Sequence, residues 1–143
     1  MFAFVVGVTG PGGDRRGTGA GTTETVEEAM KYLLMICRDE AVELSPEEQA
    51  DEDSSTQAWV EEMDGRGVRR FGHGLRPVSD ATTVRVRDGD VLVADGPFAE
   101  TKEQIAGFDV IECADLDEAI EVASKHPVAR YHGTIEVRPF WTD

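Results

Sequence analysis

The chain has 143 residues, of which 40% are hydrophobic and 30% are charged, and this length fits one domain with a substantial core. Its net charge of −15 at pH 7 argues against nucleic acid or an anionic membrane as the main partner, because phosphate contacts need clustered Lys and Arg. Apolar runs such as Tyr32–Cys37 are far too short to span a bilayer.

Residues 1–29 lack the pattern of a folded element. An apolar start, "FAFVVGV", gives way to "TGPGGDRRGTGAGTT", which is rich in Gly and Thr and has no periodicity. The segment lacks the basic start and the long apolar run of a signal peptide. It also lacks the Lys that follows the glycines of a phosphate-binding loop. We therefore predict a flexible extension over residues 1–29 and a single domain over residues 30–143.

The domain is expected to begin with a strand and a helix. Met30–Cys37 is an almost continuous apolar run, which is typical of a central strand. A helix is predicted over Ser45–Asp64, with a capping box and a proline at its first position. Its middle, Asp51–Ser55, is poor in helix formers, so a kink or a loop is expected there. The side chains expected to line its buried face are Ala58, Trp59 and Met63.

Four strands are predicted in the middle of the chain. Val68–Val78 is a strand pattern broken by glycines, which favour a bulge. Asp88-Gly89 is the favoured two-residue turn of a hairpin, and β-branched runs flank it on both sides. After a polar loop, Ile105–Ala114 has the composition of another strand.

The chain is expected to end with a helix and a closing strand. The helix begins at Asp115, which caps it together with Glu118. Gly133–Phe140 alternates between apolar and polar residues, which is typical of a strand, and its proline suits a strand end. The residues expected on the apolar face of the helix are Leu116, Ala119, Ile120 and Ala123.

From Met30 the predicted order is β-α-β, a hairpin, then β-α-β. Without the hairpin, this is the split β-α-β pattern of a ferredoxin-like α+β domain. Two helices cover only one face of such a sheet, so the other face favours burial against a second subunit in a homodimer. The candidates for these apolar faces include Val84, Val86, Phe108, Val110, Ile135 and Val137.

The cysteines and histidines give no sign of a metal site or a cofactor. Cys37 and Cys113 form no C-x-x-C pair, and the default interpretation is two buried free thiols in a cytoplasmic protein. No two of the three histidines have the spacing of metal ligands on a helix. His126 is expected at a helix end, where an imidazolium complements the helix dipole, and His132 is expected in an exposed turn.

Between the hairpin and the next strand, Asp95-Gly96-Pro97-Phe98 is followed by Glu100-Thr101-Lys102-Glu103. In a structural interpretation these residues only form a rigid turn, in which Asp accepts backbone N–H groups and Phe anchors the loop. In a functional interpretation the turn presents charged groups at the rim of a cleft, where they hold a polar ligand or transfer a proton. Both can hold at once, since binding residues often lie on loops that a scaffold positions. The charged groups are Asp95, Glu100, Lys102 and Glu103.

The run Asp95–Pro127, followed by Gly133–Phe140, resembles the DGPF-motif branch of the YCII-related proteins, and the resemblance covers Met30–Phe140. It implies a dimeric α+β barrel, in which the sheets of two ferredoxin-like subunits pack face to face. Many proteins of this branch are encoded beside extracytoplasmic-function sigma factors. The resemblance therefore also implies a sigma factor as a partner.

The wider family is associated with a His–Asp pair as an acid–base site, with the His on the first helix. The predicted first helix here, Ser45–Asp64, contains no His, so that pair does not carry over. Asp95 of the DGPF motif is the position that the resemblance carries over. His73, in "GHGLRP", is its candidate partner from the residues alone, because the flanking glycines allow a ligand to approach.

Two functional hypotheses stay open. The first is an enzyme-like cleft for acid–base chemistry on a small polar or anionic molecule. In it, Asp95 is the acid or base, His73 is its partner, and Lys102 and Arg76 orient charge. The second is a non-catalytic binding or regulatory module that docks through an acidic segment, since residues 39–64 hold eleven Asp and Glu and no Lys or Arg. Catalysis predicts a walled pocket with a perturbed titrating group, whereas docking predicts an exposed apolar patch beside the acidic segment.

Overall fold

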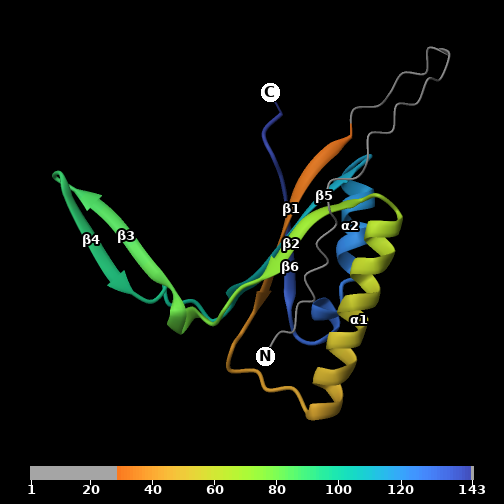
Figure 1. Ribbon diagram of the computed structural model, residues 1–143, viewed down its shortest axis with the longest axis horizontal. Helices are drawn as coiled ribbons and strands as arrows, with labels where there is room; N and C mark the ends of the chain where they lie inside the picture. The colour runs from red at the N-terminus through yellow and green to blue at the C-terminus, as the bar shows by residue number, and fades with distance from the viewer. Residues whose placement is uncertain (1–28, 143) are drawn as a thin grey trace.

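The computed structural model describes residues 29–142, so the predicted extension lies outside the described residues except for its last position. Four strands form one antiparallel sheet in the order β2-β5-β1-β6, and two strands form a separate hairpin. Both helices lie on one side of the sheet (Figure 1). The elements are β1 (Met30–Arg38), α1 (Pro46–Gly65), β2 (Arg69–Gly74), β3 (Thr82–Arg87), β4 (Asp90–Asp95), β5 (Gln104–Cys113), α2 (Leu116–Ser124) and β6 (Thr134–Pro139).

The connectivity confirms the predicted ferredoxin-like α+β fold. β1 lies in the interior of the sheet between β5 and β6. β6 forms one edge of the sheet, and β2, which pairs with β5, forms the other edge. With the hairpin set aside, the chain follows the split β-α-β order that the sequence predicts. The register of β2 against β5 shifts between Arg69 and Phe71, before the glycines that were expected to favour a bulge, and Gly72 and Gly74 pair in register.

Helix α1 runs without interruption through the segment that was expected to kink or open. The capping box forms as predicted, with the Ser45 hydroxyl accepting from the Glu48 N–H and the Glu48 carboxylate accepting in return. The expectation of a loop over Asp51–Ser55 is wrong, because Glu52 is buried there and bound by Arg38 of β1. Tertiary contacts of this kind override weak helix propensity.

The buried stripe of α1 contains Trp59 and Met63 as predicted, but Ala58 is exposed. The stripe runs through Glu52, Thr56, Trp59, Val60 and Met63, at helical spacing, and Ala58 lies outside it. In α2 the predicted face is also partly wrong. Leu116 and Ile120 are about half exposed, at 49% and 52%, because the helix places small side chains against the sheet. The buried residues of α2 are Ala119, Val122 and Ala123.

The hydrophobic core lies between the helices and one face of the sheet. The Trp59 indole donates to the Val122 carbonyl oxygen at 3.0 Å, which joins the two helices inside the core. Within residues 29–142, neither helix has the length and apolar character needed to cross a membrane. The core side chains are Tyr32, Leu34, Trp59, Val60, Met63, Val68, Ile111, Cys113, Ala119, Val122 and Ala123.

The second face of the sheet, the open face, carries the alternate residues of the same strands. Side chains of β1 alternate strictly, with Leu34 and Ile36 buried under the helices and Leu33 and Met35 on the open face. Phe108 and Val110 also lie on the open face, as predicted. Ile135 and Val137 do not, because they pair with Ile36 and Leu34 and pack against the core.

The hairpin Thr82–Asp95, here called the arm, projects away from the sheet (Figure 1). Its turn is the predicted Asp88-Gly89, and both residues have positive φ, at 50° and 82°. This is the twist that a two-residue hairpin turn requires. β3 and β4 pair with each other and not with the four-stranded sheet.

Candidate functional site

The structure distributes the six sequence-predicted site residues over five places. Asp95 ends β4 at the base of the arm, and Glu100 lies in the exposed loop that follows. His73 lies on the open face in β2, where its ring meets the Phe71 ring edge-on with 4.7 Å between centroids. Arg76 is exposed and forms an ion pair with Asp80 at 3.0 Å. Only Lys102 and Glu103 lie together in a hollow of the surface.

The DGPF turn is held by its backbone and not by its Asp or Phe side chain. Gly96 has φ of 93°, its N–H donates to the Ala81 carbonyl at 2.7 Å, and its carbonyl accepts from the Thr83 hydroxyl at 2.7 Å. The Asp95 carboxylate is exposed and has no hydrogen bond within residues 29–142. Phe98 is 80% exposed, so the expected anchoring by this ring is wrong for a single chain.

Replacing Asp95 by Asn is therefore expected to change the free energy of unfolding by no more than about 0.5 kcal/mol, since the carboxylate stabilises no contact of the turn. Gly96→Ala is the matched comparison. It should cost about 1 kcal/mol or more, because φ of 93° disfavours any side chain. Urea denaturation measures both variants. A larger loss for Asp95→Asn than for Gly96→Ala would contradict this account of the turn.

No hydrogen bond or ion pair joins Asp95 to His73 among residues 29–142. Asp95 lies on the arm and His73 on the sheet, so the predicted acid–base pair is not assembled by contacts inside one described chain. The assignment of Asp95 and His73 as an acid–base pair stays a prediction.

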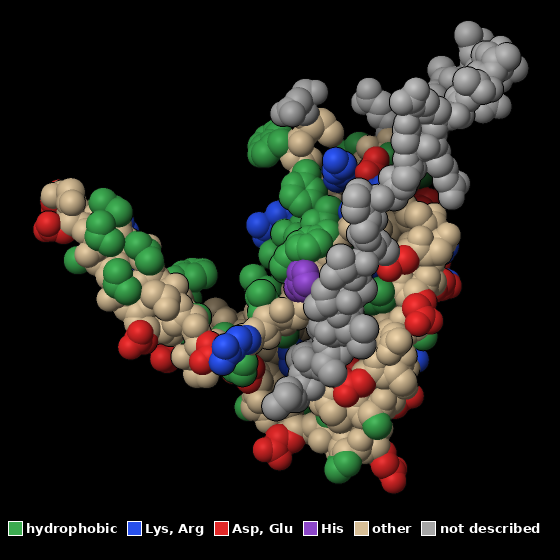
Figure 2. Space-filling view, in the orientation of Figure 1, with side chains coloured by type: hydrophobic (Ala, Val, Ile, Leu, Met, Phe, Trp, Pro, Cys, Tyr) green, Lys and Arg blue, Asp and Glu red, His purple; other side chains and the backbone are tan. Residues whose placement is uncertain are grey.

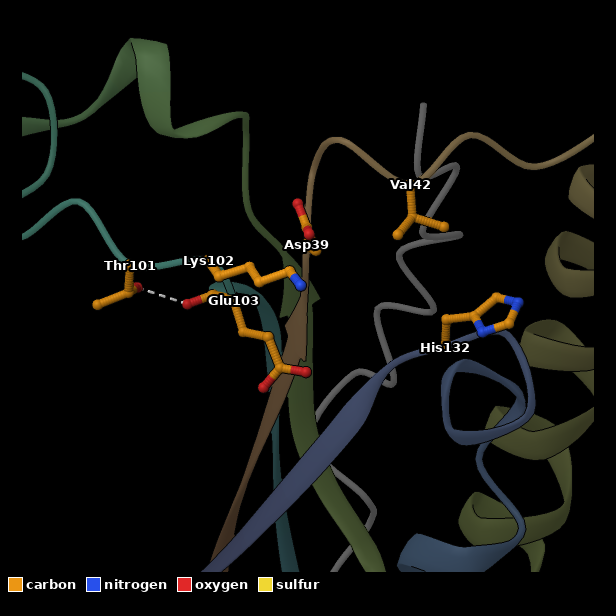
Figure 3. A pocket seen from close by; sticks show the side chains of 6 residues that line it. All are labelled: Asp39, Val42, Thr101, Lys102, Glu103 and His132. Carbon is orange, nitrogen blue, oxygen red and sulfur yellow. Dashed lines mark hydrogen bonds between the residues drawn. The ribbon is translucent and has the colours of Figure 1, made fainter.

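The hollow that contains Lys102 and Glu103 has a volume of about 690 Å³ and lies where β1 ends. Figure 3 shows Lys102 extending toward Asp39, with His132 across the hollow from them. Val42 and Thr101 complete the lining. Asp39 and His132 were not among the predicted site residues. The signal that could have found His132 is its turn with Gly133, while Asp39 is the first residue after a strand end.

The backbone around the hollow is held by side chains of the same segments. The Gln104 amide donates to the Thr101 carbonyl at 2.9 Å, and the Thr101 hydroxyl donates to the Glu103 carbonyl at 2.6 Å. The Glu103 carboxylate accepts from the Thr134 hydroxyl at 3.2 Å, which ties this loop to β6. Asp39 accepts the Ala41 N–H at 2.9 Å and so closes its own turn.

His132 occupies an uncommon backbone conformation, with φ of 62°. Gly133 follows it because a Cβ there would lie 2.1 Å from a Val128 methyl carbon and 3.1 Å from the Cys37 carbonyl oxygen. One residue before His132, the Tyr131 carbonyl accepts from the Arg38 guanidinium at 3.3 Å. The turn is therefore clamped between β1 and the core, and it holds the imidazole at the rim of the hollow.

Arg38 connects the hollow to α1. Its guanidinium donates from Nη1 to Glu52 Oε1 at 2.9 Å and also contacts Glu52 Oε2 through Nη2. Both side chains are buried, so this is a paired charge inside the protein. Since Asp39 directly follows Arg38, the ion pair sets the position of β1's end relative to the helix.

The strongly shifted pKa values belong to groups in the interior and not in the hollow. Burial lowers the pKa of His126 to about 4, with a further contribution from Arg38. Its Nδ1 accepts the Val128 N–H at 3.2 Å. The expected imidazolium at a helix end is therefore wrong, because the ring is fully buried and neutral. Burial also raises the pKa of Asp109 to about 6, against the opposing effect of Arg69.

Neither cysteine has the lowered pKa that is typical of a reactive thiol. Burial raises the pKa of Cys37, and the nearby carboxylates of Glu103 and Glu136 raise it further. The pKa of Cys113 is also raised, first by burial. Thiols with raised pKa values are poorly ionised at neutral pH. Residues 29–142 contain no group of three or more His, Cys, Asp or Glu side chains that could hold a metal ion.

Residues 30–142 match the family described as "YCII-related domain". The chain is also similar to "Uncharacterized protein R00369" of Rhizobium meliloti (strain 1021), with 40% identity over 104 residues, which cover 62% of this chain and 84% of that protein.

Proposed function

This chain belongs to the YCII-related domain family, and we propose from its geometry that it binds a small polar or anionic molecule in the hollow at the end of β1. The observation that carries the proposal is the meeting of Asp39, Lys102, Glu103 and His132 from three separate segments in one hollow. Convergent charged side chains in a surface hollow are what recognition of a small polar ligand needs.

The groups of the hollow differ in what they offer a ligand. Within residues 29–142, the Lys102 ammonium has no ion pair, so it is available to an anionic group such as a carboxylate. Asp39 and Glu103 each accept one hydrogen bond from the protein and retain further acceptor positions for donors of the ligand. His132 adds an imidazole, whose ring nitrogens can donate or accept a hydrogen bond. The best-supported ligand is small, with an anionic group at one end and hydrogen-bond donors at the other.

A thermal-shift screen of small hydroxy- and amino-carboxylic acids tests this proposal. A ligand of the hollow should raise the melting temperature of the wild type by several degrees at about 100 times its Kd. Lys102→Gln should abolish the rise, because the amide cannot pair with the anionic group. Lys31→Gln, an exposed lysine at the other end of β1, is the matched control and should keep it. An equal rise in wild type and Lys102→Gln would overturn the assignment.

His132→Asn extends the same screen. Asn tolerates the positive φ of this position, so the turn should persist without the imidazole. The variant should still bind the ligand, but more weakly than the wild type, because the imidazole no longer offers the ligand a hydrogen bond.

Acid–base chemistry by Asp95 and His73 stays a narrower proposal, with Arg76 and Glu100 as further ligand contacts. The hollow is open, and the groups with strongly shifted pKa values, Asp109 and His126, lie in the core. Both facts support ligand binding ahead of catalysis.

The alternative of a docking module had one structural requirement, an apolar patch beside the acidic segment. Five large exposed apolar side chains lie on the arm, which projects away from α1 (Figure 1): Val84, Val86, Val91, Leu92 and Val93. On α2, Leu116 and Ile120 are half exposed. A sigma factor as partner therefore stays a prediction, and docking through the acidic helix has no support from this arrangement.

We also propose that the open face is the interface of a homodimer. Phe71 is 51% exposed there, and its ring lies 5.7 Å from the ring of Phe108. Leu33, Met35 and Val110 extend this apolar surface across β1 and β5. An antiparallel sheet with an apolar second face requires a cover, and a two-fold axis lets the same face of a second copy supply it.

A further inference from the structure

The arm carries the most exposed contiguous apolar surface among the described strands. Its register pairs Val84 with Val93 and Val86 with Val91, so the four side chains share one face of the hairpin. These valines, here called the valine face, are 60%, 65%, 57% and 66% exposed in that order. The other face of the arm is mixed, since it pairs Thr83 with Ala94, Arg85 with Leu92 and Arg87 with Asp90.

An arm of this kind is not expected to stand alone in water. A two-stranded hairpin is marginally stable at best unless a further layer covers its apolar face. Four exposed valines on one face would also make it prone to pair with other chains. The valine face therefore requires a cover that the described chain does not provide.

We propose that the valine face docks on a second copy of this chain and clamps the homodimer. The inference rests on the proposed dimer, and its occupant follows from the position of the arm. Figure 2 shows the arm and the sheet as two walls of an open V, with apolar side chains on both walls. A subunit seated on the open face enters this V and meets the arm as well.

The size of the interface favours the same occupant. A stable dimer buries about 800 Å² and 20–30 residues on each side. The open face belongs to a sheet of four strands, and its apolar side chains Leu33, Met35, Phe108 and Val110 are already partly covered by their neighbours. The arm supplies the missing surface, and two-fold symmetry makes both arms contribute at once. Asp95 shares the valine face through its pairing with Thr82, which places the DGPF motif at the edge of the same contact.

Sedimentation velocity over a concentration series tests the clamp. The variant replaces all four valines by Thr, which keeps the shape and the strand propensity but adds hydroxyls that would lose water on docking. We expect the wild type to be a dimer at micromolar concentration and the variant to dimerise about 100-fold more weakly. The matched control, Leu92→Thr with Ala94→Thr on the other face, should dimerise like the wild type.

Two other results have defined meanings. A wild type that stays monomeric at micromolar concentration would overturn the dimer and the clamp together. A wild-type dimer that the four-valine variant forms equally well would overturn the clamp alone.

A measurement on the wild type tests the clamp without any substitution, so it does not depend on whether the arm of the variant folds. Amide hydrogen exchange of residues 82–95 should be slow at high protein concentration and should accelerate on dilution, while β5 stays protected. Exchange in the arm that does not respond to dilution would overturn the clamp. The hollow at the end of β1 is not part of the proposed clamp, so the outcome of the ligand-binding test does not depend on these results.

Discussion

Replacing Glu52 by Gln is expected to lower the free energy of unfolding by about 3 kcal/mol, because it removes the charge of a buried carboxylate that the Arg38 guanidinium binds through two nitrogens. Glu52 is 0% exposed and Arg38 is 7% exposed, so water cannot compensate for the lost charge. The amide keeps one acceptor for Arg38 but loses the paired geometry of two N–H groups with two carboxylate oxygens. Urea denaturation measures the effect.

Glu61→Gln is the matched control for Glu52→Gln. Glu61 lies on the same helix but is exposed, so its replacement should change the free energy of unfolding by less than about 0.5 kcal/mol. The double replacement Arg38→Met with Glu52→Leu should recover much of the loss, since apolar residues can substitute for a buried ion pair. Equal losses for Glu52→Gln and Glu61→Gln would contradict the burial of this pair.

The same variant should affect the hollow. Arg38 also holds the Tyr131 carbonyl, and Tyr131 precedes His132. Without the Glu52 carboxylate the guanidinium is held by fewer contacts, so the end of β1 and the His132 turn are anchored less firmly. We expect any ligand that stabilises the wild type to bind Glu52→Gln more weakly at a temperature where both proteins are folded.

Two buried groups should give the stability of the fold opposite responses to pH. The pKa of His126 is about 4 in the folded protein, below its ordinary 6.5, so the unfolded chain takes up a proton first as the pH falls. Its stabilising contribution is complete above pH 6.5 and is lost as the pH falls toward 4. The pKa of Asp109 is about 6, above its ordinary 3.8. Its contribution is complete below pH 3.8 and is lost as the pH rises toward 6.

Variants of these groups should therefore change stability with opposite slopes. Relative to the wild type, the free energy of unfolding of Asp109→Asn should rise by about 2 to 3 kcal/mol between pH 4 and pH 6. That of His126→Asn should fall by a similar amount, about 2 to 3 kcal/mol, between pH 4 and pH 6.5. Urea denaturation of each variant and the wild type at several pH values measures these differences. The exposed carboxylates contribute equally to both proteins, so their contributions cancel. Parallel slopes for the two variants would exclude these assignments.

Asp109 shows how a close approach between strands creates such a group. A Cβ on Gly72 would lie 1.9 Å from Asp109 Oδ1, so only glycine leaves room for the carboxylate beneath β2. Arg69 donates to the same oxygen at 2.9 Å and also reaches Asp64 of α1 at 3.4 Å. The Arg69 guanidinium at the start of β2 thus joins the end of α1, through Asp64, to the buried carboxylate of Asp109 in β5.

Local signals in the sequence were sufficient for most of the elements. The Ser45–Glu48 capping box begins α1, and Asp88-Gly89 closes the arm, because each signal acts between residues a few positions apart. The alternation within β1 also determines which of its side chains meet the helices. Element order then leads to the ferredoxin-like fold, since few topologies bury two helices on one sheet.

The errors fall where distant residues decide the outcome. Asp51–Ser55 is helical because Arg38, fourteen residues before Glu52, binds that carboxylate in the core. His126 is neutral because the fold buries its ring beside Trp59, with 4.7 Å between ring centroids. Neither contact leaves a pattern in the neighbouring sequence, so propensity and helix-dipole arguments gave the wrong answer.

The candidate site depends on tertiary structure in the same way. The sequence by itself determined that Lys102 and Glu103 lie on a polar loop between two strands. It could not place Asp39 and His132 beside them, because those residues lie sixty-three positions before Lys102 and thirty after it. They meet only because β1 pairs with both β5 and β6, which brings the strand end, the loop and the turn to one edge of the sheet. Pairing between distant strands is a property of the folded chain as a whole, and it decided the composition of the hollow.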